Sequence, residues 1–154
     1  MTIPTTLPAD ESSTPVFVYG SLMSPKILYG IIGSPPNLTP TLLKAQMAPA
    51  TLHAHKRHSV QGADFPAVVQ TGVDTDSVHG FLVTGLTEAQ KGRINSFEGY
   101  LYTSERVNIV LEGGKSCWAS VYVWAGKVED LGAKEWTFEA FKMTRMYSRW
   151  GQGE

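Results

Sequence analysis

The most informative acidic residue is Glu98, which we place in the last turn of a predicted helix beside Phe97, Tyr100 and Tyr102. The helix dipole disfavours a negative charge at that position by about 0.3–1 kcal/mol. A solvated carboxylate at a frayed helix end needs no function, and the pattern alone favours it. The functional interpretation is that the dipole and the aromatic surroundings raise the pKa of Glu98, which suits a group that transfers protons near neutral pH.

The stretch VFVYGSLM, residues 16–23, could supply a partner for such a carboxylate. It predicts a core strand that breaks at Gly20, where the absence of a side chain permits a tight turn. The N–H groups of Ser21, Leu22 and Met23, just before a helix start, would then point at an anion. A plain turn is the alternative. Ser21 itself is a weak candidate nucleophile, because the second glycine of the hydrolase pattern G-x-S-x-G is missing.

The histidines and the cysteine are weaker candidates. His53 and His55 would share one face of a strand, a spacing that zinc sites use, but no third ligand accompanies them and the adjacent Lys56 and Arg57 would repel a cation. We therefore interpret them as ordinary strand histidines and predict no metal site. Cys117 stands among apolar residues in a predicted strand, where packing is a simpler role than catalysis.

The sequence predicts about six strands and three helices, which must position these residues. A helix from Pro25, capped by Ser24, should end at Gly33, and a second, over residues 86–100, has a capping box formed by Thr87 and Gln90. Residues 34–41 should form a loop, and residues 134–150 an amphipathic helix. Strands are predicted over residues 50–60, 65–70, 78–86, 102–111 and 116–126, the second with the third and the fourth with the fifth as hairpins.

Length, charge and cysteine content limit the number of domains and the kinds of partner that we expect. The chain has 154 residues, a net charge of −1 and one cysteine, so we expect one soluble domain over residues 15–154 after a flexible leader, residues 1–14. The near-neutral charge argues against nucleic acid as a partner, and no run approaches the roughly 20 apolar residues that span a bilayer. The single cysteine and the lack of a signal peptide favour the cytoplasm. Short connections predict a mainly antiparallel α+β domain, with a small barrel as a plausible form.

Two separated motifs, VYGSL at 18–22 and FEG followed by a tyrosine four residues after Glu98, resemble the gamma-glutamylcyclotransferase-like superfamily, specifically its AIG2-like branch. FPAVV at 65–69, the V-x-G from Val78 and EWTFEAF at 135–141 add to the resemblance in the expected order. It implies a small mixed, mainly antiparallel β-barrel flanked by helices. It also implies an enzyme without metal or cofactor, in which the α-amino group of a γ-glutamyl substrate attacks its own γ-carbonyl and releases 5-oxoproline and an amine or amino acid.

The resemblance implies Glu98 as the catalytic acid and base. The predicted substrate-binding residues are Val18, Tyr19, Gly20, Ser21, Leu22, Met23 and Tyr102. We expect a small-molecule substrate, no membrane or nucleic-acid partner, and a monomer or weak homodimer.

One position departs from the branch, which often has arginine two residues after the tyrosine of FEG-x-x-Y. Here Ser104 stands at that place and the basic residue is Arg106, which would face the same side of a strand. Either Arg106 substitutes or the pocket accepts another group. Two other functions therefore stay open: a different proton transfer by Glu98 on a specialised metabolite, and a ligand-binding module without turnover. Catalysis requires Glu98 and the loop to face one cavity.

Overall fold

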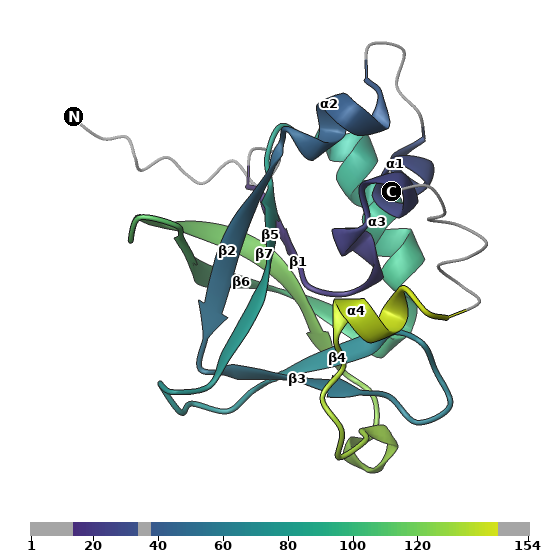
Figure 1. Ribbon diagram of the computed structural model, residues 1–154, viewed down its shortest axis with the longest axis vertical. Coiled ribbons are helices and arrows are strands. Elements are labelled where there is room, and N and C mark those ends of the chain that lie inside the picture. Colours follow the sequence, from purple (N-terminus) through teal and green to yellow (C-terminus); the bar gives the residue numbers. More distant parts are fainter. Residues whose placement is uncertain (1–13, 34–37, 145–154) are drawn as a thin grey trace.

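A closed five-stranded barrel forms the centre of the computed structural model, which describes residues 14–33 and 38–144 (Figure 1). The strand order is β1-β5-β2-β6-β7, and a parallel pairing of Val16 with Ser120 closes the barrel between β1 and β7. The other barrel pairings are antiparallel, as expected from the short connections. The strands are β1 (Val16–Val18), β2 (Met47–His53), β5 (Ser77–Val83), β6 (Tyr102–Leu111) and β7 (Ser116–Trp124).

A separate two-stranded sheet, β3 (His55–Ser59) with β4 (Pro66–Gln70), lies beside the barrel (Figure 1). The predictions of one strand over 50–60 and of a 65–86 hairpin are both wrong. The chain bends at Ala54, whose φ of 63° is rare for a residue with a side chain. The Ala54 carbonyl accepts hydrogen bonds from the N–H groups of Thr71 and Gly72, which joins β4 to this corner. β4 therefore pairs with β3, whereas β5 enters the barrel.

Four α-helices accompany the sheets: α1 (Pro25–Ile32), α2 (Pro40–Lys44), α3 (Glu88–Glu98) and α4 (Phe138–Phe141). The predicted ends of α1 are confirmed, because Ser24 accepts a hydrogen bond from the Ile27 N–H and Gly33 ends the helix in a left-handed conformation. The capping box of Thr87 and Gln90 on α3 is also confirmed. Short 3₁₀ turns, η3 (Ser21–Met23), η4 (Gly99–Leu101) and η5 (Val128–Asp130), complete the list.

Two of the helix predictions need correction. Pro40 begins α2 inside the stretch predicted as a loop, with Thr39 as its cap. The predicted amphipathic helix over 134–150 is helical only at Phe138–Phe141 within the described residues, and its last six residues, like the predicted leader up to residue 13, lie outside them. None of the helices in the described ranges is long and apolar enough to cross a membrane.

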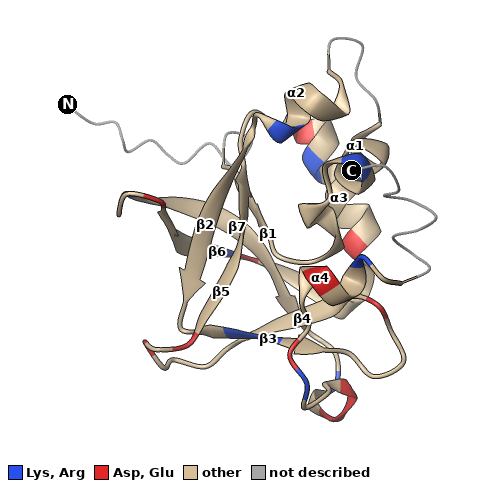
Figure 2. Cartoon of the chain, in the orientation of Figure 1, with Lys and Arg blue, Asp and Glu red and all other residues tan. Residues whose placement is uncertain are grey.

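Two apolar clusters fill the molecule, and β1 contributes to both because its side chains alternate. The barrel core contains Phe17 and Tyr19 with Ala50, Leu52, Val68, Val78, Leu82, Ile109, Ala119, Val121 and Val123. The helix-side core lies between the barrel and the helices and contains Val16 and Val18 with Leu22, Ile27, Leu28, Ile32, Leu43, Met47, Val83, Leu86, Ile94, Tyr122, Trp136 and Phe141. Charged residues are interspersed in sign over the helices, turns and strand β3 (Figure 2).

Candidate active site

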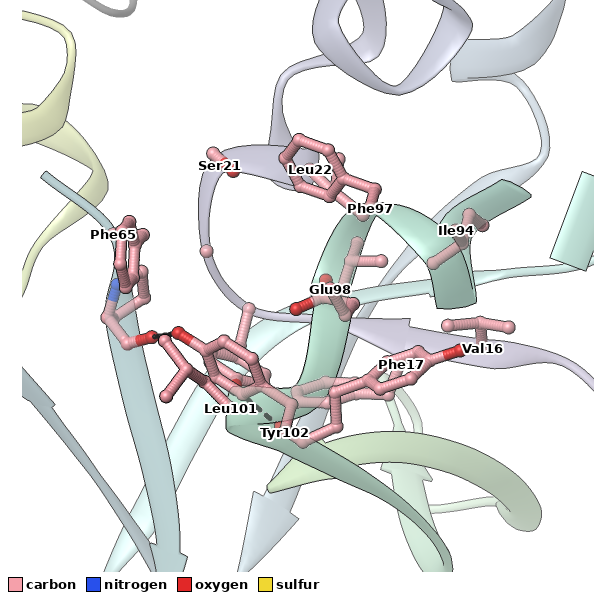
Figure 3. Close-up of a pocket in the computed structure, with 15 residues that line it drawn as sticks. Val16, Phe17, Ser21, Leu22, Phe65, Ile94, Phe97, Glu98, Leu101 and Tyr102 are labelled. Carbon is pink, nitrogen blue, oxygen red and sulfur yellow. Dashed lines mark hydrogen bonds between the residues drawn. The ribbon is translucent and has the colours of Figure 1, made fainter. Parts of the chain in front are cut away.

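A cavity of about 330 Å³ opens where β1 ends, between the turn that follows it and the end of α3 (Figure 3). Its wall is mainly apolar and aromatic. Glu98 is the one carboxylate in the wall, and no lysine, arginine or histidine of the described chain joins it. The lining residues are Val16, Phe17, Val18, Tyr19, Gly20, Ser21, Leu22, Phe65, Pro66, Ile94, Phe97, Glu98, Leu101, Tyr102 and Tyr122.

The turn after β1 lines this cavity through Gly20, Ser21 and Leu22. A β-carbon added to Gly20 would lie 2.8 Å from Cγ of Pro66, so the turn passes β4 at a distance that only glycine permits. The Gly20 carbonyl accepts a hydrogen bond from the Met23 N–H, which starts η3. No atom of the described residues accepts a hydrogen bond from the N–H of Gly20, Ser21 or Leu22. Three donors are thus available to a ligand.

Glu98 ends α3 and faces this turn. In Figure 3 its carboxylate points into the space between Ser21 and Tyr102. Burial raises the pKa of Glu98 from 4.5 to about 7, because the charged form loses hydration and no cation in the cavity wall compensates. The carboxyl is therefore poised to gain or lose a proton near neutral pH, as the functional interpretation of this residue expects.

Three tyrosines surround the Glu98 carboxyl, and each of their hydroxyls donates a hydrogen bond to another group of the protein. Tyr19 donates to the Tyr122 carbonyl, and Tyr102 donates to the Pro66 carbonyl at 2.6 Å. Tyr122 donates to Oδ1 of Asn95 at 3.2 Å. Burial, with the charge of Glu98, raises the pKa of Tyr122 to about 12 and that of Tyr102 further. These hydroxyls stay neutral, which leaves Glu98 as the group that titrates in the physiological range.

Most of the predicted site residues meet at the cavity. Val18, Tyr19, Gly20, Ser21, Leu22, Glu98 and Tyr102 line it, whereas Met23 packs against the helix-side core instead. The Ser21 hydroxyl has no histidine beside it in the cavity wall, so no hydrolase-like pair forms in the described chain.

The basic residue after the FEG motif lies elsewhere. Arg106 is exposed on β6, where its guanidinium stacks on Trp118 with 5.5 Å to the ring centroid, and Ser104 is exposed as well. Neither residue lines the cavity.

The histidine pair does not form a metal site. The bend at Ala54 separates His53, exposed at the end of β2, from His55, which is buried in β3 and bonds through Nδ1 to the His53 carbonyl. Within the described ranges, no three histidine, cysteine, aspartate or glutamate residues gather closely enough to hold a metal ion.

Sequence reasoning missed the part of the wall that β4 and β7 supply. Phe65 and Pro66 belong to a motif used only as supporting evidence, and Tyr122 was assigned only to a strand face. Their place in the site depends on which strands are neighbours, and this pairing is a tertiary property.

Comparisons with known proteins agree with this architecture. Residues 16–138 match the family described as "Gamma-glutamyl cyclotransferase, AIG2-like". The Arabidopsis thaliana Protein AIG2 C is 28% identical over 136 residues, which cover 88% of this chain and 76% of that protein. AIG2-like protein D of the same plant is 30% identical over 133 residues, which cover 85% of this chain and 80% of that protein.

Solved structures show the same fold. A solution structure from Arabidopsis thaliana has a TM-score of 0.66 and 26% identity, with 94% of this chain and 81% of that one covered. A structure named Gamma-glutamyl cyclotransferase has a TM-score of 0.54 at 16% identity, with 73% and 67% covered. The matching motifs, the closed barrel and the family match over most of the chain lead to one conclusion: the chain belongs to the AIG2-like gamma-glutamyl cyclotransferase family.

Proposed function

We propose that this protein cyclises a γ-glutamyl group to 5-oxoproline and releases an amine or amino acid. One observation carries the proposal: a carboxyl with a pKa of about 7 shares a cavity with three backbone N–H groups that have no partner among the described residues. The carboxyl supplies proton transfer, and the N–H groups supply a site for negative charge. Membership of the family supports the same reaction at a coarse level.

The reaction needs one proton carrier and no external nucleophile. Ionised Glu98 accepts a proton from the α-ammonium of the substrate, and the freed amine attacks the γ-carbonyl carbon. The new C–N bond pushes the carbonyl electrons onto oxygen, where the N–H groups of residues 20–22 stabilise the oxyanion. When the carbonyl re-forms, the original amide C–N bond breaks and protonated Glu98 returns its proton to the departing nitrogen. Ionised again, Glu98 carries the second proton of the ring nitrogen to the released amine, which leaves as an ammonium. The residue ends in its starting state, and atoms and charge balance.

Ring closure makes modest demands on the protein, because nucleophile and electrophile belong to one molecule. The cavity has to hold the γ-glutamyl chain in a folded shape, and intramolecular reactions of well-oriented groups reach effective molarities of about 10⁵–10⁸ M. Phe65 and Tyr102, whose ring centroids are 6.4 Å apart, supply rigid walls for that purpose. The same walls exclude water from the carboxyl and so maintain its raised pKa.

Purified protein incubated with γ-glutamyl amines and γ-glutamyl dipeptides, followed by detection of 5-oxoproline, tests the proposal. We expect Glu98→Gln to lose about 10²–10⁴-fold in kcat, because glutamine has the shape but cannot carry the proton. Glu105→Gln, an exposed carboxylate on β6, is the matched control and should retain wild-type activity. No turnover of any γ-glutamyl compound, or full activity of Glu98→Gln, would reject the assignment.

A second candidate function is another Glu98-dependent proton transfer, such as an isomerisation or elimination, on a less polar metabolite. The apolar and aromatic wall favours it, since the described chain places no cation in the cavity for a substrate carboxylate. A metabolite extract incubated with wild type and Glu98→Gln in parallel, and compared by mass spectrometry, would reveal it as a conversion seen only with wild type. A protein that only binds a ligand would give the same extract in both incubations. We also propose a cytoplasmic location, which the single cysteine favours.

A further inference from the structure

Arg57 is a nearly buried cation that contacts the site from behind. It lies on β3, its side chain is 10% exposed, and it does not line the cavity. Its Nη1 donates to the Tyr19 carbonyl at 2.8 Å and to the His79 carbonyl at 3.1 Å. The Arg57 side chain thus connects β3 to Tyr19, the residue that follows β1 and begins the turn.

The geometry of the peptide unit gives this contact a consequence. The Tyr19 carbonyl and the Gly20 N–H belong to the same planar trans peptide, so they point in opposite directions. A guanidinium that holds the carbonyl outside the cavity therefore turns the Gly20 N–H away from itself, toward the cavity that Gly20 lines. We infer that Arg57 is the positioning residue of the site, which fixes the Gly20 N–H as an anion donor. The inference rests on the proposed function for its catalytic consequence only.

Other residues hold Arg57 in turn. Its guanidinium stacks on Trp136 with 5.3 Å to the ring centroid, and the Trp136 indole N–H donates to the Asp64 carbonyl at 2.7 Å. Glu135 lies 3.9 Å from Nη2 but is mostly exposed, so this ion pair contributes little. Trp136 thus fixes the plane of the guanidinium, and the guanidinium fixes the plane of the peptide between Tyr19 and Gly20.

Burying a charged side chain such as Arg57 costs more free energy than a neutral side chain would if its role were only to hold the two strands together. Burial lowers the pKa of Arg57, and its Nε is buried without a hydrogen-bond partner. A charged donor on the Tyr19 carbonyl polarises the peptide, and this makes the Gly20 N–H a stronger donor to developing negative charge. The positive charge itself lies behind the turn, where it favours an anion without entering the cavity. A neutral residue that filled the same space would give neither effect.

The first test measures orientation and needs no substrate. Residual dipolar couplings of ¹⁵N-labelled protein report the direction of each N–H bond. We expect Arg57→Met to change the coupling of Gly20 while those of β6 and β7 stay as in wild type, and Arg57→Lys, which keeps a charged donor, to give a smaller change. Lys56→Met, an exposed neighbour on β3, should leave the Gly20 coupling unchanged. An unchanged Gly20 coupling in folded Arg57→Met, or a change in Arg57→Lys as large as that in Arg57→Met, would overturn the inference.

The second test uses turnover. Arg57→Met should lower kcat at least tenfold with little change in KM, and Arg57→Lys should recover part of that loss. Millimolar methylguanidinium should restore activity to Arg57→Ala at least threefold and should not restore Glu98→Gln. If wild type converts no γ-glutamyl compound, the proposed function fails while the dipolar couplings still decide the role of Arg57. If wild type is active and Arg57→Met retains full kcat, the positioning role fails alone.

Discussion

The barrel core and the cavity wall are built on the same short strand, yet they treat polar groups in opposite ways. Phe17 contacts both regions, whereas Leu52, Ile109 and Val121 of the barrel core are nearly inaccessible and do not line the cavity. Val18 lines the cavity, whose wall holds the carboxyl of Glu98 and N–H groups that have no acceptor among the described residues. The barrel core stabilises the fold, whereas the cavity lowers its stability, because groups there lose hydration and gain a partner only when a ligand binds.

A carboxylate with a raised pKa that acts on a substrate has to lie at the boundary between the core and the solvent. Inside the barrel core Glu98 would have no access to substrate, and on the surface it would be solvated with an ordinary pKa. The end of α3 places it at the boundary, where aromatic walls exclude water from one side of a cavity that remains open to a small molecule. Four predictions test this contrast, from the largest expected effect to the smallest.

Truncation should separate the two regions most clearly. Ile109→Ala in the barrel core, which does not line the cavity, should lower the free energy of unfolding by about 2–5 kcal/mol, because a fully buried side chain leaves a void that its neighbours cannot fill. Phe65→Ala in the half-buried cavity wall should cost no more than about 1–2 kcal/mol and should raise KM instead. Urea unfolding and steady-state kinetics measure the two effects. Equal losses of stability would contradict the contrast.

A β-carbon at the turn should disturb the cavity from its rim. Gly20→Ala would place this atom 2.8 Å from Pro66, so we expect a loss of about 1–3 kcal/mol in unfolding free energy and a drop in activity as the turn shifts. Gly92→Ala on the exposed face of α3 is the matched control: its β-carbon meets nothing within 4 Å, and it should stabilise the helix by about 0.5–1 kcal/mol. A neutral Gly20→Ala would mean that the turn has room to spare.

Removing the titratable group should make the protein more stable at alkaline pH. The folded-state pKa of Glu98 is about 7 against 4.5 for the ordinary group, so between these values the folded protein binds more protons than the unfolded chain. The stability that Glu98 contributes is therefore lost as pH rises from about 4.5 through 7.

We expect Glu98→Gln, whose side chain stays neutral, to exceed wild type in unfolding free energy by about 1–2 kcal/mol at pH 8, a value reduced from the full shift because the residue is partly exposed. At pH 4 the two proteins should be nearly equal. Urea titrations at both pH values measure the difference, and a difference that does not depend on pH would contradict the raised pKa.

The smallest effect should come from the hydrogen bond that joins Tyr102 to β4. Tyr102→Phe leaves the Pro66 carbonyl without this donor, so we expect a loss of about 0.5–1.5 kcal/mol in thermal or urea unfolding and a modest increase in KM. Tyr100→Phe is the control, because the Tyr100 side chain is 91% exposed and should tolerate the change. A larger loss than that of Gly20→Ala would indicate that the hydroxyl, and not the close approach of Gly20, fixes the cavity wall.

Local signals predicted a large part of the fold. Ser24 with Pro25, and Thr87 with Gln90, announce helix starts through hydrogen bonds within one turn, and the turn between β6 and β7 depends on adjacent glycines. Thr39 with Pro40 is the same start signal as Ser24 with Pro25, but the prolines around it favoured a loop. The break between β2 and β3 was not predictable from alternation, because Ala54 adopts a conformation that its residue type disfavours.

The candidate site divides in the same way. Glu98 and the turn at Gly20 have local motifs, so both could be named in advance. Phe65 and Tyr122 enter the wall, and Arg57 reaches Tyr19, through strand pairings and side-chain contacts between distant segments, which one sequence does not specify. Arg106 is exposed in a part of β6 where Thr103, Ser104 and Glu105 are exposed as well, and exposure on both faces of a strand is not predictable from alternation.

A titration of the Glu98 carboxyl itself tests the central claim, that the cavity holds this group ready for proton transfer near neutral pH. Protein labelled with ¹³C at glutamate side-chain carboxyls can be followed by NMR from pH 3 to pH 9, with Glu98→Gln identifying the resonance. We predict a midpoint of about 7 for this carboxyl. A midpoint near the ordinary 4.5 would show a solvated carboxylate at a helix end and would contradict the account.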